Sequence, residues 1–436
     1  MDAEPVTLRR GRDYLVEVVT RTRDIGHGFP GGTVDAFDVW VELKAEDETG
    51  RVFFWSGWVA DQPGGRKGPV DPGAHFYRSF LLDANGNPIN KRNAWSARAL
   101  LYARVIPPGA ADTAHFRIHV PEGAGNQMKL TARVNHRKFS WWNTQWSYAG
   151  VRDPADAAPR VSPHYDDGAW VFTGDTSKVS GPLKEIPDLP ITEVATDVKT
   201  LRLAPGDSPE PPQVVLSAGE RPSSRERFND YGIGLLLQRD FKGAIRAFEE
   251  VHAIDPKYAD GLVNIARVRI EEGNHRAAHE TLKQALELAP ALPKAHYFFA
   301  LTLKTQGRYD EAEGHLNTAL ETYPRDRVVL NQLGRILFLQ RRYDEAIAAL
   351  KRVIAVDPED IQAHYNLMLS YRGKGDVEAA RREETLYARF KADESAQEIT
   401  GARRRSHPED NNERQLIHDH VSTWAGVTRQ PGYTGQ

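Results

Sequence analysis

Four prolines at an interval of 34 residues constrain the fold of this 436-residue chain more than any other feature. They are Pro256, Pro290, Pro324 and Pro358. From Ser223 onward the apolar residues follow a helical period,. Small residues recur at the same interval, where paired helices would cross and a large side chain would push them apart: Ala244, Ala278, Ala312, Ala346 and Ala380. The pattern predicts stacked helical repeats.

The interval and the residue pattern resemble tetratricopeptide repeats. The resemblance covers residues 223–391 and implies an α-solenoid of about five repeats. An apolar residue recurs four positions after each small residue, on the packing face: Phe248, Leu282, Leu316 and Leu350. In the fifth repeat, 359–391, Glu384 takes that place. We therefore expect the fifth repeat to be a cap with a solvated outer face.

The resemblance implies a concave groove, lined by the first helix of each repeat, that binds peptides or protein surfaces. The alternative is a solvated face with incidental apolar residues, but basic and aromatic residues recur in register and favour the groove. A basic row beside aromatic residues suits an extended segment carrying carboxylates and apolar anchors. The predicted groove residues are Ile233, Leu236, Val263, Arg267, Ile270, Tyr297, Leu301, Lys304, Asn331, Arg335, Phe338, Tyr365, Leu369 and Arg372.

Within the first 150 residues, the stretch from Tyr14 to about His136 has a period of two, which is typical of β-strands,. Short strand candidates separated by turn signals, including 76–82, 97–105, 114–120 and 128–136, predict an immunoglobulin-like antiparallel β-sandwich,. Residues 151–222 are rich in proline, glycine and aspartate and are interpreted as a wrap and linker with one possible strand, "DVKTLRL",. Residues 392–436 form a C-terminal tail. The predicted fold class is multidomain, all-β plus all-α.

Composition excludes several kinds of chemistry. The chain has no cysteine, so it has no disulfide, no thiol nucleophile, no cysteine-ligated zinc or iron–sulfur cluster, and no covalent c-type haem. The formal net charge of -3 gives no strong attraction to nucleic acid or anionic membranes,. We expect no membrane span. The first residues lack a signal-peptide pattern, so we expect a cytoplasmic protein, a mature form or a fragment.

Several segments of the first half resemble the β-domain of multihaem c-type cytochromes of bacterial respiratory chains. They are "GHGFPGGTVDAFDVWVELKAEDETGRVFFWSG", "HFYRSFLLDANGNPINKRNAW", "RVIPPGAADTAHFRIHVPEG" and "LTARVNHRKF", and the tail "HPEDNNERQLIHDH" resembles the end of such proteins. The haem-binding portion of that family is absent. The resemblance implies a periplasmic or other extracytoplasmic setting, with cytochromes or membrane-complex subunits as partners of the sandwich or the groove.

Three histidines are candidate ligands. His27, in "DIGHGFPGG", either hydrogen-bonds a backbone carbonyl and closes the sandwich end, or serves as an axial ligand to haem on a neighbouring chain,. In "IHDH", the spacing of His418 and His420 on an extended segment can present both rings to one metal ion, with an uncertain third ligand,. The alternative for these two is a polar tail packed on the last repeat.

Two further patterns have structural interpretations. Trp141, Trp142 and Trp146 can stack on a sugar or cofactor ring, although such a cluster more often seals a core or an interface,. "DANGN" lacks the glycine position and the final glutamate of a calcium loop and is interpreted as a turn,.

The chain shows no catalytic motif, so we expect a non-enzymatic interaction scaffold or accessory subunit without a cofactor, working in an extracytoplasmic electron-transfer or membrane-associated complex. The alternatives are a redox protein or cytochrome fragment with histidine-ligated haem or metal, and a carbohydrate-binding module or enzyme that uses the tryptophan cluster.

Overall fold

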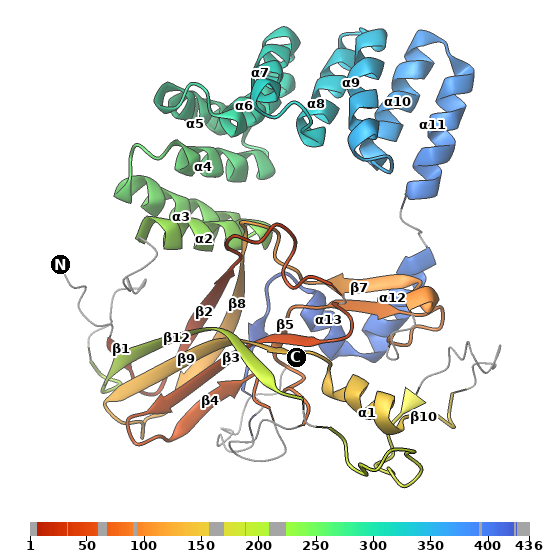
Figure 1. The fold of residues 1–436 in the computed structure, drawn as a ribbon. Coiled ribbons are helices and arrows are strands. Elements are labelled where there is room, and N and C mark those ends of the chain that lie inside the picture. Colours follow the sequence, from red (N-terminus) through yellow and green to blue (C-terminus); the bar gives the residue numbers. More distant parts are fainter. Residues whose placement is uncertain are drawn as a thin grey trace. The chain divides into compact units, whose positions relative to one another are not determined.

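The fold comprises two compact units, one of which is discontinuous in the sequence. A computed structural model describes residues 7–32, 34–59, 68–89, 94–156, 170–187, 189–208, 224–391, 395–422 and 424. The β-rich unit contains residues 1–219 together with 394–436, and the helical unit contains residues 220–393 (Figure 1). The segment predicted as a separate C-terminal tail therefore belongs to the β-rich unit, because it pairs with a strand of that unit.

The larger sheet has the order β1-β12-β9-β3-β4, with β5 also paired to β3. All pairs are antiparallel except β1 with β12. The strands are β1 (Thr7–Arg9), β3 (Asp38–Asp47), β4 (Val52–Ser56), β5 (His75–Phe76), β9 (Gln127–Arg137) and β12 (Ile191–Ala204).

A second sheet packs against this one through a shared apolar core. Its order is β13-β8-β2, from Asp419–His420, Ala111–Val120 and Arg12–Arg21, and β13 runs parallel to β8. Phe116 and Ile118 of β8 join Val39 and Val41 of β3 in one buried cluster. The two sheets thus form a layered β-structure. The immunoglobulin-like strand order stays a prediction.

The alternation of β3 explains its central place. Val39, Val41 and Leu43 face the core between the sheets, as the period of two predicts,. Trp40, on the opposite face, is also buried, under a second cluster with Val70, Ala74 and Phe76. Both faces of β3 are therefore covered, which fixes its register.

The region predicted as a wrap and linker contains a major strand. β12 extends over 14 residues and pairs with nearly the whole of β9. The predicted segment "DVKTLRL" is the second half of this strand. The preceding residues 191–196 are mostly exposed, and their apolar side chains do not alternate with polar ones, so they lack the pattern that marks a strand in a sequence.

The β-rich unit carries several smaller elements. β6 pairs with β7, and helix α12 packs on them. These elements are β6 (Ser79–Leu82), η1 (Ala94–Ser96), β7 (Ala99–Ala103), α1 (Trp141–Ala149), β10 (Val151–Arg152), β11 (Trp170–Val171), α12 (Ser395–Ser406) and α13 (Pro408–Arg414).

The helical unit consists of helix pairs that follow the 34-residue interval. The helices are α2 (Ser224–Leu237), α3 (Phe241–Ile254), α4 (Ala259–Glu271), α5 (His275–Leu288), α6 (Pro293–Thr305), α7 (Tyr309–Thr322), α8 (Arg327–Leu339), α9 (Tyr343–Val356), α10 (Ile361–Lys374) and α11 (Val377–Phe390). The five recurring alanines are almost fully buried, as are the four apolar residues that follow them. The predicted repeat register is confirmed.

The turn within each repeat needs a left-handed backbone at one position. Gly273, Gly307 and Gly375 have φ of 81°, 73° and 87° there, and Arg239 and Arg341 adopt φ of 66° and 62° at the equivalent positions,. The first and fourth repeats thus keep the same turn without glycine, at some strain. No helix in the described part of the chain is long and apolar enough to span a membrane.

Candidate functional site

The C-terminal segment is bound into the β-rich unit by polar and aromatic contacts. Arg104 donates to Glu413 at its carboxylate (2.8 Å) and its carbonyl (2.6 Å). The amide of Trp55 donates to the Ser422 hydroxyl at 3.2 Å. The segment is therefore part of the β-rich unit.

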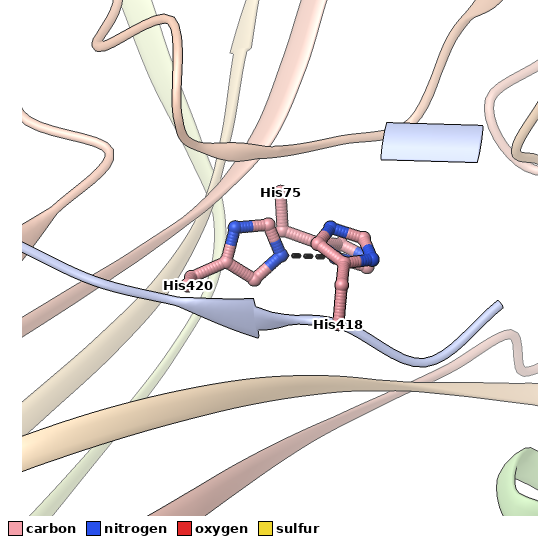
Figure 2. A group of neighbouring side chains, drawn as sticks. All are labelled: His75, His418 and His420. Atoms are coloured by element: carbon pink, nitrogen blue, oxygen red, sulfur yellow. Dashed lines mark hydrogen bonds between the residues drawn. The ribbon is translucent and has the colours of Figure 1, made fainter. Parts of the chain in front are cut away.

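The binding of the C-terminal segment to the β-rich unit brings three histidines together (Figure 2). His75 lies on β5, and His418 and His420 lie at β13. Each offers one ring nitrogen such that the three lie within 4.8 Å of one another. Nδ1 of His75 and Nε2 of His420 are 3.0 Å apart. His75 and His420 are 3% and 2% exposed, so the cluster is inside the unit.

Each histidine also has an oxygen at its other ring nitrogen. Nε2 of His75 lies 2.7 Å from Oδ2 of Asp112. Nδ1 of His420 lies 2.8 Å from the Gly73 carbonyl. Nδ1 of His418 lies 3.1 Å from the carbonyl of Gln415. Because carbonyl and carboxylate oxygens accept, these three nitrogens are assigned as the donors.

Burial shapes the electrostatics of the cluster. Burial and the charge of Arg104 lower the pKa of His75, against its hydrogen bond to Asp112. Burial and the neighbouring His75 lower the pKa of His420 to about 3. Burial alone would raise the pKa of Asp112, but its hydrogen bond with His75 lowers it to about 2. The two buried imidazoles are neutral at pH 7, and the carboxylate is ionised.

Glu413 adds a second buried carboxylate. Its Oε1 lies 3.2 Å from Nε2 of His418. Burial on its own would raise the pKa of Glu413, but His418 and the charge of Arg104 hold it well below its usual range. The cluster thus presents three imidazoles and an ionised carboxylate, a donor set that suits first-row transition metals.

The sequence placed two of these histidines together but missed the third. His418 and His420 lie side by side, as their spacing predicts. Of the acidic residues near them in the sequence, Asp410 is bound by Arg403 instead, at 2.9 and 2.6 Å. His75 lies at the edge of a predicted strand, and only the three-dimensional fold brings it to the pair. Metal binding itself stays a prediction.

His27 lies apart from this chemistry. Its imidazole is exposed, and Nδ1 donates to the carbonyl of Gly28 at 2.9 Å. The ring packs so close to Gly31 that a Cβ there would lie 2.6 Å from Cε1 of His27. These contacts are those of a loop residue that bonds a backbone carbonyl. Its role as a haem ligand stays a prediction.

The predicted groove residues fall into three groups. Arg267, Tyr297, Leu301, Lys304, Arg335 and Phe338 are half-buried, as are Ile233, Ile270 and Leu369. Tyr365 and Arg372 are exposed, and Arg372 pairs with Glu384 at 2.9 Å. Leu236, Val263 and Asn331 are buried.

The buried group corrects the prediction. Leu236 and Val263 belong to the core of the first repeats, because they face the second helices rather than solvent. Asn331 donates its amide to Asp360 at 3.2 Å, so its amide nitrogen is used within the fold. These three are not residues of an open groove.

Lys304 and Arg335, half-buried cations of neighbouring repeats, lie close enough for their charges to interact. Lys304 donates to Oε1 of Gln332 at 2.7 Å, and burial and the charge of Arg335 lower the pKa of Lys304. Nη1 of Arg335 is buried and has no hydrogen-bond partner within the described ranges. Its guanidinium lies 5.2 Å from the ring centre of Phe338. We call Arg267, Lys304 and Arg335 the basic row.

The tryptophan cluster lies on and beside α1. Trp142 and Trp146 stack at 6.2 Å, and Trp170 meets Trp146 edge-on at 6.1 Å. A pocket of about 520 Å³ lies beside α1 and is lined in part by Phe139, Trp146 and Leu189. Sugar binding there stays a prediction. The "DANGN" turn is confirmed: Asp83 accepts from the amides of Asn85 and Asn87 at 2.8 and 2.9 Å.

Comparisons with known proteins match the helical unit. Tetratricopeptide repeat models match residues 235–282, 269–336 and 334–375. The BBSome complex member BBS4 of Bos taurus is 26% identical over 144 residues, which are 33% of this chain and 28% of that protein. The photosystem I assembly protein Ycf3 of Synechococcus elongatus is 32% identical over 110 residues, 22% of this chain and 64% of that protein.

Two further proteins are similar to part of this chain. The type IV pilus assembly protein PilF of Pseudomonas aeruginosa is 31% identical over 91 residues, 21% of this chain and 36% of that protein. A solved structure of MamA from Desulfovibrio magneticus is 19% identical, with a TM-score of 0.36, over 40% of this chain and 96% of that one. The chain thus spans only part of its curated relatives, and residues 235–375 are tetratricopeptide repeats.

Proposed function

We propose that this chain is a non-enzymatic scaffold whose repeats bind an extended, carboxylate-bearing segment of a partner protein. The observation that carries the proposal is the basic row. Within the described part of the repeats, neither Arg267 nor Lys304 nor Arg335 forms an ion pair. Arg372, by contrast, is paired. Lys304 and Arg335 are half-buried and interact with each other, and neither has an ion-pair partner within the described repeats, which raises the free energy of the fold. A bound carboxylate would relieve that cost.

The chemistry of the row indicates what the segment contains. The cations would orient carboxylates and raise the association rate. Tyr297 and Phe338 lie beside them but also pack on the repeat core. Exposed Tyr365 is 41% accessible, and an apolar side chain of the partner can cover it. The tetratricopeptide relatives BBS4 and Ycf3 are described as members or assembly factors of complexes, which supports a scaffold role.

The setting that we propose is an extracytoplasmic electron-transfer or membrane-associated assembly. Its support is the sequence resemblance of the β-rich unit to the β-domain of multihaem cytochromes. Fractionating cells that express the native gene, with immunodetection of this chain, tests the setting separately from the groove.

Replacing the cations of the row with neutral, polar glutamine tests the binding proposal. The probe is a library of fluorescent, extended peptides in which glutamate or lysine alternates with leucine, read by anisotropy at low and high salt. We expect glutamate peptides to bind, and Lys304→Gln and Arg335→Gln each to weaken binding and flatten its salt dependence.

The matched control is Arg352→Gln on α9, the second helix of the same repeat, where the guanidinium donates to the Pro324 carbonyl. It should bind like the wild type. Equal binding of glutamate and lysine peptides, or equal losses in the control and the row variants, would overturn the proposal.

A further inference from the structure

We propose that His75, His418 and His420 bind one divalent first-row transition metal ion of the zinc type, with Glu413 as the fourth ligand. The site lies within the β-rich unit and is independent of the repeats and of the proposed peptide binding. It would join the C-terminal segment to β5, so its role would be structural.

The outer ring nitrogens of the three histidines point to oxygen acceptors. Asp112, Gly73 and Gln415 each take one N–H from the outer nitrogen of a histidine. This pattern, in which an oxygen fixes the tautomer of each imidazole, is how proteins orient histidine ligands. It leaves a lone pair on the inner nitrogen of each ring.

The lone pairs of the inner ring nitrogens face other hydrogen-bond acceptors. Nδ1 of His75 and Nε2 of His420 are 3.0 Å apart, and Nε2 of His418 lies 3.2 Å from the Glu413 carboxylate. Both are contacts between two acceptors unless a cation intervenes. Two protons, one for each contact, would also satisfy the geometry. A single divalent ion satisfies both contacts at once.

The charges around the cluster suit a cation. His75 and His420 are 3% and 2% exposed, so an ion bound between them would be shielded from water. The charges that face the cluster are the carboxylates of Asp112 and Glu413 and the guanidinium of Arg104. Their sum is one negative charge, which a divalent cation reverses to one positive.

The dimensions are within reach of a tetrahedral site. Zinc–nitrogen bonds of 2.0–2.1 Å place two ligand nitrogens about 3.3 Å apart. The pair at 3.0 Å is already at that spacing, and the widest separation of 4.8 Å must shorten. The ring of His418, with 12% of its side chain exposed, has the most room to turn. The carboxylate of Glu413 contacts His418 but is not among the atoms that lie within 4.8 Å of one another, so it must also move to complete a closed, four-coordinate site.

The test uses the full chain after dialysis against a chelator. Titration with zinc by calorimetry should give one ion per chain, and cobalt(II) should give the intense visible absorption of a tetrahedral site. His418→Ala removes the least buried of the three histidines. It should weaken zinc binding about 100-fold or more while circular dichroism stays unchanged.

His119→Ala is the matched control. His119 belongs to β8 of the same unit and pairs with Asp13 at 2.7 Å, away from the cluster, so zinc binding should be unchanged. A wild-type chain without stoichiometric zinc binding and without the cobalt spectrum would show that protons fill the cluster. Equal zinc affinity of the wild type and His418→Ala would place the bound ion elsewhere. Either result overturns the proposal. The cobalt titration uses the wild-type chain, so it tests the proposal even if a variant fails to fold.

Discussion

Arg104 and Glu413 are 309 residues apart in the sequence, yet the guanidinium of Arg104 binds both the carboxylate and the backbone carbonyl of Glu413. Their side chains are 14% and 8% exposed. This pair connects β7 and its following loop to the C-terminal segment, next to the histidine cluster. A second pair, Arg117 of β8 with Asp419, also holds the C-terminal segment but is far more exposed, at 43% and 33%.

The two pairs should differ sharply in their contribution to stability. Arg104→Met leaves the carboxylate of Glu413 buried and without its cation, which costs about 3–5 kcal/mol. Arg117→Met removes an exposed pair and should cost about 0–1 kcal/mol. Urea unfolding, together with limited proteolysis of the C-terminal segment, measures both. Equal costs would show that the segment is not held by the buried pair.

The buried charge of Lys304 should lower the stability of the folded chain. Its pKa is lowered by burial and by Arg335, so the folded chain binds fewer protons than the unfolded chain just below pH 10.5, and stability rises with pH in that window. At pH 7 the full cost is present. Lys304→Met should therefore raise Tm at pH 7 by about 2–4 °C, equivalent to about 1 kcal/mol.

The difference in Tm between wild type and Lys304→Met should shrink as the pH approaches 10.5, the ordinary lysine value. Lys351→Met, at an exposed position on α9, is the control and should change Tm little. A lower Tm for Lys304→Met at pH 7 would contradict the unfavourable charge.

Two helical glycines should respond oppositely to alanine. At Gly334 a Cβ would lie 2.5 Å from Cγ of Leu350, a buried residue of the packing face. Gly334→Ala should destabilise the repeats by about 1–3 kcal/mol through overpacking. At Gly314 a Cβ meets nothing within 4 Å, so Gly314→Ala should stabilise by about 0.5–1 kcal/mol. Thermal unfolding of both variants checks the sign at each site.

The helical unit should fold without its neighbour. Residues 220–393 form one compact unit with their own buried core, so this fragment should unfold cooperatively by circular dichroism. Residues 1–219 alone lack β13, α12 and α13, and they should be less stable than the same unit with its C-terminal segment. An equally stable 1–219 fragment would show that the segment contributes nothing.

The repeats were predictable because their contacts are local. Ala312 and Leu316 pack against helices that are neighbours in the sequence. Their packing is therefore visible in the sequence as a fixed interval between equivalent residues. The histidine cluster depends on a strand at residue 75 and another at residue 420, and no periodicity connects them. Only the second half of β12 is predictable from the sequence, because residues 191–196 are mostly exposed and show no regular alternation of apolar and polar side chains.

The discontinuity of the β-rich unit affects the order in which it can be completed. A ribosome that has made residues 1–219 must still synthesise the whole helical unit before β13 exists. At 5–20 residues per second this takes about 10–35 s. Throughout that time the outer edge of β8 stays without its last strand, and the contact surface on β7 stays uncovered. A premature stop codon anywhere in the repeats would therefore also damage the domain translated first.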